Sequence, residues 1–221
     1  MIYPMDITNQ KRNLQPAKLP PEAILKELLQ LSAMRHQHLC PRQVLGVRIG
    51  LCGLRQLGLI DAAFFPQFHN EKKRLLTIVE MDGCGADGVA VATDCYVGRR
   101  TLRVVDYGKV AATLIDRQTG QAVRVWPSPE SRNLAEQLAP EADSRWHAYL
   151  LGYQRMADAD LLRFRPVQLT QTIAEIISKP NLRAICEQCG EEVMNEREQV
   201  VNGRILCQPC AGNSYYKARW R

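Results

Sequence analysis

The chain has 221 residues, of which 46% are hydrophobic and 24% are charged, so it can hold one domain of ordinary size and a small appendage. No apolar run reaches the roughly 18 to 20 residues that span a bilayer, and the start lacks the apolar core of a signal peptide. We therefore expect a cytoplasmic protein with no membrane-spanning segment. Eight cysteines in a reducing compartment favour metal or thiol chemistry over disulfide bonds.

The first part of the chain predicts an arm followed by two helices. Residues 1–20 are polar and contain three prolines, which indicates a loose arm. An amphipathic pattern predicts a helix over residues 22–35. A second helix is expected from Pro41 to about Leu57, because proline favours the first turn and a glycine follows the end. Its three glycines at positions 46, 50 and 53 predict the close approach of another backbone.

Strands and helices then alternate irregularly. A buried strand is expected at residues 75–79, with a short helix following over 87–95. Residues 133–156 have a helical pattern broken at Pro140. Further strands are expected at 102–105, 110–115, 122–126 and 161–169, with Thr119-Gly120 turning a hairpin. The pattern predicts an α+β fold in which helices pack on a mainly antiparallel sheet.

Two thiols precede expected helices and have imidazole or carboxylate neighbours. Cys40 falls at the N-cap of the second helix, where unpaired N–H groups stabilise a thiolate, and His36 and His38 lie just before it. Cys84 sits in a glycine-rich loop after a strand, flanked by two aspartates at positions 82 and 87. Such a group suits a transition metal or a nucleophile, whereas the bland alternative is a set of buried thiols and a capping histidine.

The C-terminal region carries Cys186-x-x-Cys189 and Cys207-x-x-Cys210, with seventeen residues (190–206) between the pairs. This spacing is typical of a Zn²⁺ site, and the Asn-Gly turn between two short apolar runs predicts a hairpin inside it. Because all four ligands are cysteines, no coordination position stays open and the zinc is expected to be structural. Two redox motifs are the alternative. We expect a core at 21–170, a linker at 171–183, and a zinc finger with a basic tail at 184–221.

The charge of this finger tests a role in nucleic-acid binding. Residues 181–221 carry six basic and five acidic side chains, a net charge of 6 − 5 = +1. A DNA-binding finger usually shows a stronger basic patch. We therefore do not expect nucleic acid as a partner, and a zinc-finger transcriptional regulator stays the least favoured alternative.

The run His36-Gln37-His38-Leu39-Cys40-Pro41 resembles the H-x-H-x-C-P signature of the FmdE family, named after a component of formylmethanofuran dehydrogenase. Later blocks match in order: Glu80-x-Asp82-x-Cys84-x-x-Asp87, Cys95 with Gly98, and Asp106-Tyr107-Gly108-Lys109. The four-cysteine module resembles the treble-clef zinc finger of some members. Gln37, Arg42 and Arg99-Arg100 depart from the family pattern, and the arginines add positive charge near the expected cleft.

The resemblance implies an α+β core that dimerises and a link to molybdenum or tungsten formylmethanofuran dehydrogenase, which reduces carbon dioxide in methanogenesis. It also implies a cleft holding a second transition metal or a cofactor. Its expected binding residues are His36, His38, Cys40, Asp82, Cys84, Asp87 and Lys109. The leading hypothesis is a metal-binding accessory protein with a protein partner from such an enzyme system. The alternative is a thiol-dependent enzyme with Cys40 as nucleophile and His38 as general base, so whether the chain is an enzyme stays open.

Overall fold

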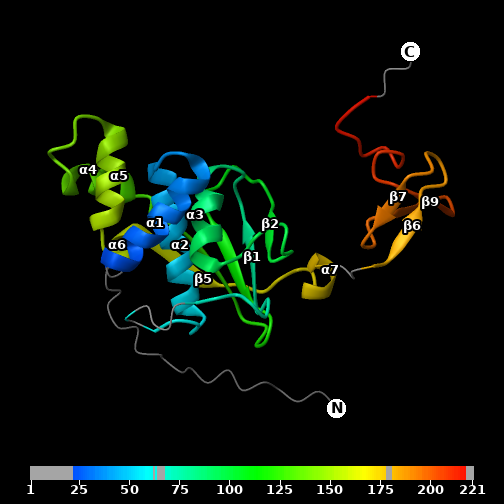
Figure 1. The fold of residues 1–221 in the computed structure, drawn as a ribbon, viewed down its shortest axis with the longest axis horizontal. Coiled ribbons are helices and arrows are strands. Elements are labelled where there is room, and N and C mark those ends of the chain that lie inside the picture. Colours follow the sequence, from blue (N-terminus) through cyan, green and yellow to red (C-terminus); the bar gives the residue numbers. More distant parts are fainter. Residues whose placement is uncertain (1–21, 62, 64–67, 178–180, 218–221) are drawn as a thin grey trace. The chain divides into compact units, whose positions relative to one another are not determined.

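The fold is taken from a computed structural model, which describes residues 22–61, 63, 68–177 and 181–217. The expected arm at 1–20 and the last four residues of the basic tail lie outside the described residues. The chain forms two compact units, Met1–Gln168 and Leu169–Arg221 (Figure 1). Each unit is described by itself.

A five-stranded sheet forms the framework of the first unit. Its strand order is β2-β1-β3-β4-β5, and β1 pairs with β2 in parallel while the other pairs are antiparallel. The prediction of a mainly antiparallel sheet is confirmed. The strands are β1 (Leu75–Val79), β2 (Leu102–Val104), β3 (Ala112–Asp116), β4 (Ala122–Pro127) and β5 (Leu162–Pro166).

The helices of the first unit follow the sequence prediction with two differences. The helical region after residue 130 is two helices separated by residues 139–144, and the third helix begins at Cys84 instead of Asp87. It begins early because Gly83 adopts the extended N-cap conformation, which leaves Asp87 inside the first turn. The helices are α1 (Glu22–His36), α2 (Pro41–Gln56), α3 (Cys84–Thr93), α4 (Ser131–Leu138), α5 (Arg145–Arg155) and α6 (Asp158–Leu161).

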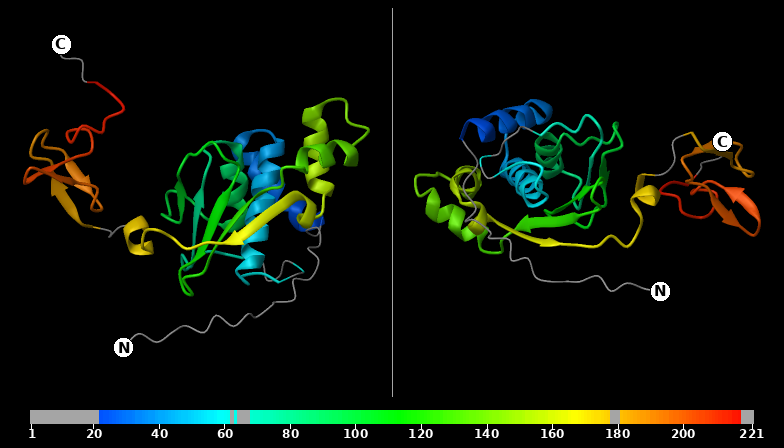
Figure 2. Two further views of the ribbon diagram at one scale, coloured as in Figure 1. Left: turned by 180° about the vertical axis from the view of Figure 1, so that it is seen from behind. Right: turned by 90° about the horizontal axis from the view of Figure 1, so that it is seen from below.

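Helix α2 lies at the centre of this unit and is buried continuously from Pro41 to Leu54, apart from the exposed Arg42. Figure 2 (right) looks along α2 and α3, which lie between α1 and the curved sheet. A Cβ atom at Gly46 would lie 2.2 Å from the carbonyl oxygen of Gly85, and one at Gly88 would lie 2.3 Å from that of Gln43. The predicted close approach of a second backbone to α2 is therefore confirmed, and the partner is α3.

A buried guanidinium joins α2 to the end of the helical region. Arg48 is 0% exposed, and its Nη2 lies 2.6 Å from Oδ1 of Asp158. The same guanidinium donates to the carbonyl oxygens of Tyr153 and Met156, each at 2.7 Å. Arg55 completes the group with Nη2 2.8 Å from Oδ2 of Asp158. Burial lowers the pKa of Arg48, while the Asp158 carboxylate acts in the opposite direction.

The second unit consists of one short helix and two hairpins. Asn202 and Gly203 turn the second hairpin with φ values of 51° and 77°, so the predicted Asn-Gly hairpin is confirmed. The expected linker contains a helix that the sequence analysis did not predict. The elements are α7 (Ile173–Ile177), β6 (Arg183–Ile185), β7 (Glu192–Met194), β8 (Gln199–Val201) and β9 (Arg204–Leu206). In both units together, none of the described helices has the length and apolar character needed to cross a bilayer.

Candidate functional site: a two-thiol cleft and a four-cysteine cluster

Cys40 is the N-cap of α2, as the sequence predicts, and it is 7% exposed. Its backbone N–H donates to Oε1 of Gln43 at 2.8 Å. The amide nitrogen of Gln43 in turn donates to the carbonyl and the hydroxyl oxygen of Ser32 on α1, each at 3.0 Å. The fully buried Gln43 therefore fixes the start of α2, and Cys40 with it, against α1.

Cys84 is brought to Cys40 by the packing of the two helices. It is the first residue of α3, and the glycine contacts between α2 and α3 let the two helix starts come together. Burial raises the pKa of the Cys84 thiol, and the neighbouring Cys40 thiol raises it further, while Arg42 acts in the opposite direction. The two cysteines, 44 positions apart in the sequence (84 − 40), form one pair of thiols in space.

His36 links Cys84 to a carboxylate. Its Nε2 lies 3.2 Å from Sγ of Cys84, and its Nδ1 lies 3.2 Å from Oδ2 of Asp87. The Asp87 contact orients the ring and leaves Nε2 directed at the sulfur. Carboxylate, imidazole and thiol therefore form one chain of contacts, a Cys84–His36–Asp87 relay.

The other predicted residues lie further from this relay. The His38 ring is exposed and lies 4.9 Å from the His36 ring, between centroids. Among the described residues, the structure records no hydrogen bond between His38 and Cys40. Gln37, between the two histidines, adopts φ 64°, the left-handed region that favours glycine, which explains why the family pattern has glycine there. Asp82 is exposed on the loop before α3.

A cleft with a volume of about 800 Å³ opens beside the two thiols. We call it the core cleft, and its size suits a small organic ligand. Among the predicted site residues, Cys40, Cys84 and Lys109 line it, whereas His36, His38, Asp82 and Asp87 do not. Arg42, one of the departures from the family pattern, also lines it. Arg99 instead pairs with Asp94, with the Nη1–Oδ2 distance at 3.0 Å.

Several lining residues were not identified from the sequence. The wall opposite the thiols contains Arg124 and Trp126 of β4, Arg132 of α4, and Trp146, Tyr149 and Tyr153 of α5. The α5 aromatics recur at positions i, i+3 and i+7, so their spacing could have indicated one aromatic helix face. The arginines gave no such signal, because their place depends on how β4 and α4 pack.

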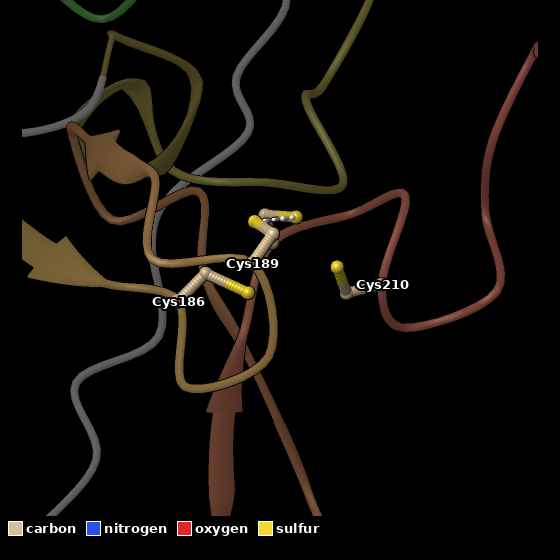
Figure 3. Close-up of side chains that lie close together, drawn as sticks. Cys186, Cys189 and Cys210 are labelled. Atoms are coloured by element: carbon tan, nitrogen blue, oxygen red, sulfur yellow. Dashed lines mark hydrogen bonds between the residues drawn. The ribbon is translucent and has the colours of Figure 1, made fainter. Parts of the chain in front are cut away.

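The second unit brings the four predicted zinc ligands together. The Sγ atoms of Cys186, Cys189, Cys207 and Cys210 all lie within 4.8 Å of one another. Three of them are labelled in Figure 3, where they approach one another from two loops. Within the described part of the chain, no other group of three or more His, Cys, Asp or Glu residues gathers its ligand atoms as closely. Four sulfur ligands at such distances could hold a tetrahedral metal ion such as Zn²⁺.

The surroundings of these cysteines suit a metal. Backbone N–H groups of Cys189 and Cys207 lower the pKa of Cys186 to about 6, while the neighbouring thiols raise that of Cys210 to about 12. Gly190 follows the first pair with φ 76°, and its N–H donates to the Cys186 carbonyl at 2.9 Å, which closes the first loop. Ligand sulfurs are therefore held by backbone donors, as a thiolate–metal site requires.

Comparison with known proteins agrees with this architecture. Residues 35–199 match the model of the family described as "FmdE, Molybdenum formylmethanofuran dehydrogenase operon". A protein of Archaeoglobus fulgidus, named "Probable S-adenosyl-L-methionine-binding protein", is 30% identical over 215 residues. The match covers 89% of this chain and 55% of that protein, so the chain spans about half the length of this curated relative.

A crystal structure from Syntrophus aciditrophicus shares the fold. The protein in it is described as an FmdE-like protein of tungsten formylmethanofuran dehydrogenase, and it matches with a TM-score of 0.57 and 21% sequence identity. The match covers 87% of this chain and 95% of that chain. Together with the α+β core and the four-cysteine cluster, these matches show that the chain belongs to the FmdE family.

Proposed function

We propose that this chain is an accessory protein of formylmethanofuran dehydrogenase metabolism, the conversion of carbon dioxide to a bound one-carbon unit. We further propose that its core cleft binds a transition metal or a metal-containing cofactor through Cys84, Cys40 and His36. The family match supports the metabolic link. The observation that carries the binding site is the Cys84–His36–Asp87 relay, with Cys40 beside Cys84.

The chemistry of these groups supports a metal. Thiolate and imidazole together suit several transition metals, and a histidine that binds a metal almost always has its second nitrogen on a carboxylate or a carbonyl. His36 has this arrangement, with Asp87 on Nδ1. The ligand atoms of the relay are not gathered as closely as the sulfurs of the four-cysteine cluster. The proposal therefore requires His36 to move toward the two thiols when the metal binds.

Metal content per chain tests this proposal. Elemental analysis would compare the native protein with Cys84→Ser, Cys207→Ser and the control Cys52→Ser, whose thiol is buried in the core away from the cleft. We expect Cys207→Ser to lose one zinc and Cys84→Ser to lose a second metal, with Cys52→Ser unchanged. Equal metal content in the native protein and Cys84→Ser, after supply of zinc, nickel, cobalt and iron, would contradict a metal in the core cleft.

A thiol-dependent enzyme is the second candidate, favoured by the same relay. A thiol, an imidazole and a carboxylate in sequence are the arrangement of an activated nucleophile. In this case the proposed nucleophile is Cys84 with His36 as its base, because His36 lies 3.2 Å from that sulfur. Iodoacetamide labelling followed by mass spectrometry tests it. Selective labelling of Cys84, slowed at least tenfold by His36→Ala, would support an enzyme, whereas equal rates at Cys84 and Cys95 would not.

The zinc site, the assembly and the location of the protein are further proposals. We propose Zn²⁺ as the metal of the four-cysteine cluster, because Cys₄ sites of this spacing select zinc. We also propose a cytoplasmic homodimer that contacts a protein of the dehydrogenase system, as the family resemblance implies. Light scattering coupled to size-exclusion chromatography would show twice the 25.0 kDa chain mass for a dimer.

The Archaeoglobus relative raises S-adenosyl-L-methionine as a ligand for the core cleft. The aromatic wall would accept its adenine ring. Its sulfonium and ammonium groups would, however, face Arg42, Lys109 and Arg132, which are cations. We therefore do not extend this ligand to the present chain.

A further inference from the structure

The core cleft is lined by charges of one sign. Four cationic side chains face it: Arg42, Lys109, Arg124 and Arg132. No aspartate or glutamate is among its lining residues, all of which belong to the described part of the chain. A cavity lined by cations alone raises the local concentration of anions and holds them through charge-assisted hydrogen bonds.

One of these cations is already neutralised. Arg124 makes a bidentate pair with the buried Glu80, with Nε–Oε1 at 2.6 Å and Nη2–Oε2 at 2.7 Å. The other three have no carboxylate partner among the described residues. Arg132 acts on the phenol of Tyr153 and is held at the wall by it. Three positive charges therefore remain for a ligand.

The wall opposite the thiols is aromatic. Trp146, Tyr149 and Tyr153 lie on one face of α5, and Tyr149 stacks on Tyr153 at 5.7 Å between ring centroids. Trp146 is 45% exposed, which is a large apolar surface to leave in water. On β4, Trp126 is held by Arg124 and Arg165, whose guanidinium carbons lie 5.1 and 5.4 Å from its ring centroid. Rigid aromatic side chains at a cleft wall are suited to stacking a flat ring.

We infer that the core cleft binds an anionic small molecule with a planar ring, the anion on Arg42 and Lys109 and the ring against Trp146 and Tyr149. This inference rests on the proposed function for the cleft's role as a binding site and adds the chemical class of its organic ligand. The anionic group is a phosphate or a carboxylate, since both pair with arginine and lysine. The two thiols lie in the same cleft, so a metal held there would contact the same ligand.

Isothermal titration with matched probes tests the inference. Flavin mononucleotide and riboflavin share one ring system and differ in the phosphate, while 2-naphthoate and 2-naphthamide differ in the carboxylate charge. We expect the charged member of at least one pair to bind at least tenfold more tightly than its neutral counterpart, less so at 0.5 M NaCl because salt screens exposed charges. The pair showing the preference identifies the anion. No preference in either pair, or no binding of any probe, would overturn the inference.

Variants place the binding in the cleft. Lys109→Gln removes one exposed lining cation, and Lys72→Gln removes an equal charge outside the cleft. We expect the first to weaken the charged probe at least fivefold and the second to leave it unchanged. Trp146→Ala should weaken both members of a pair, with the exposed Tyr107→Ala as its control. Equal effects of the lysine variants would overturn the assignment.

Metal content measured on the same samples separates this inference from the proposed function. The charged probe should still bind to Cys84→Ser, because the cations and aromatic rings remain. If the probes bind while no second metal is found, the metal proposal fails and the ligand class stands. If a second metal is found while no probe binds, the ligand class fails and the metal site stands.

Discussion

Gly46 of α2 faces Gly85 of α3 so closely that a Cβ atom on Gly46 would lie 2.2 Å from the Gly85 carbonyl oxygen. The atom in its way belongs to the backbone, so no side-chain rotation can relieve the clash. The same contact sets how near the first turn of α3, with Cys84, comes to α2. Packing and site geometry therefore depend on one glycine.

Gly46→Ala should destabilise the protein by about 1–3 kcal/mol, the usual cost of overpacking a well-packed interior. Urea unfolding followed by tryptophan fluorescence would measure the loss. Gly98→Ala is the control, because a Cβ atom there meets nothing within 4 Å. Equal stability of the Gly46→Ala and Gly98→Ala variants would contradict the close contact.

Arg48→Met should cost about 3–5 kcal/mol of unfolding free energy, because it leaves the Asp158 carboxylate buried with one arginine fewer. It also removes the donor to the Tyr153 and Met156 carbonyl oxygens. Chemical denaturation measures the loss. In the double variant with Asp158→Leu, part of the stability should return, since the buried charge is gone. A single variant as stable as the native protein would show that the pair does not matter for stability.

Asp116 predicts a pH dependence of stability. The Arg74 guanidinium, with Nη2 2.7 Å from Oδ2, lowers the pKa of this carboxyl below its ordinary value of 3.8. A carboxylate whose folded pKa is depressed stabilises the fold above its unfolded pKa, and the contribution is lost as pH falls through the folded value. Asp116→Asn should therefore be less stable at pH 7, and its stability should fall less between pH 5 and pH 2.

Urea midpoints measured at several pH values between 2 and 7 would show this difference. Asp160→Asn is the matched control, because Asp160 is exposed and the change is the same. We expect the control to follow the native curve. Parallel curves for the native protein and Asp116→Asn would mean that Asp116 does not contribute to acid sensitivity.

Removal of the metal should unfold the second unit and spare the first. The buried side chains of the second unit are Cys186, Leu206 and Cys207, so the proposed metal ligands supply most of its core. In the first unit, a large cluster of buried aliphatic residues needs no metal. Trypsin with EDTA should therefore cut rapidly after Arg197 and Arg204 and leave a stable fragment of the first unit. Equal cutting rates with and without EDTA would contradict this expectation.

Sequence patterns predicted most of the framework because local chemistry decided it. Pro41 and Gly58 bracket α2, Asn202-Gly203 turns the second hairpin, and the cysteine spacing places the metal cluster. The glycines of α2 predicted the contact with α3, since small residues in a helix are otherwise costly. These features depend on a few neighbouring residues, so a single sequence carries them.

Tertiary context decided what the patterns missed. Arg48 lies outside the expected apolar face of α2, yet it is fully buried, because its partner Asp158 is 110 residues away. His36, rather than His38, contacts a thiol, because α1 ends where the first turn of α3 begins. Arg124 and Trp126 reach the cleft only through the order of strands in the sheet. No local periodicity reports such pairings.

The separation of Arg48 from Asp158 has a consequence for synthesis on the ribosome. Helices α1, α2 and α3 emerge long before residue 158, so for most of translation the Arg48 guanidinium lacks the carboxylate of Asp158. A nascent chain that buried it early would bury an uncompensated charge. The first unit is thus expected to complete its fold only after α6 has left the exit tunnel, nearly as a single event.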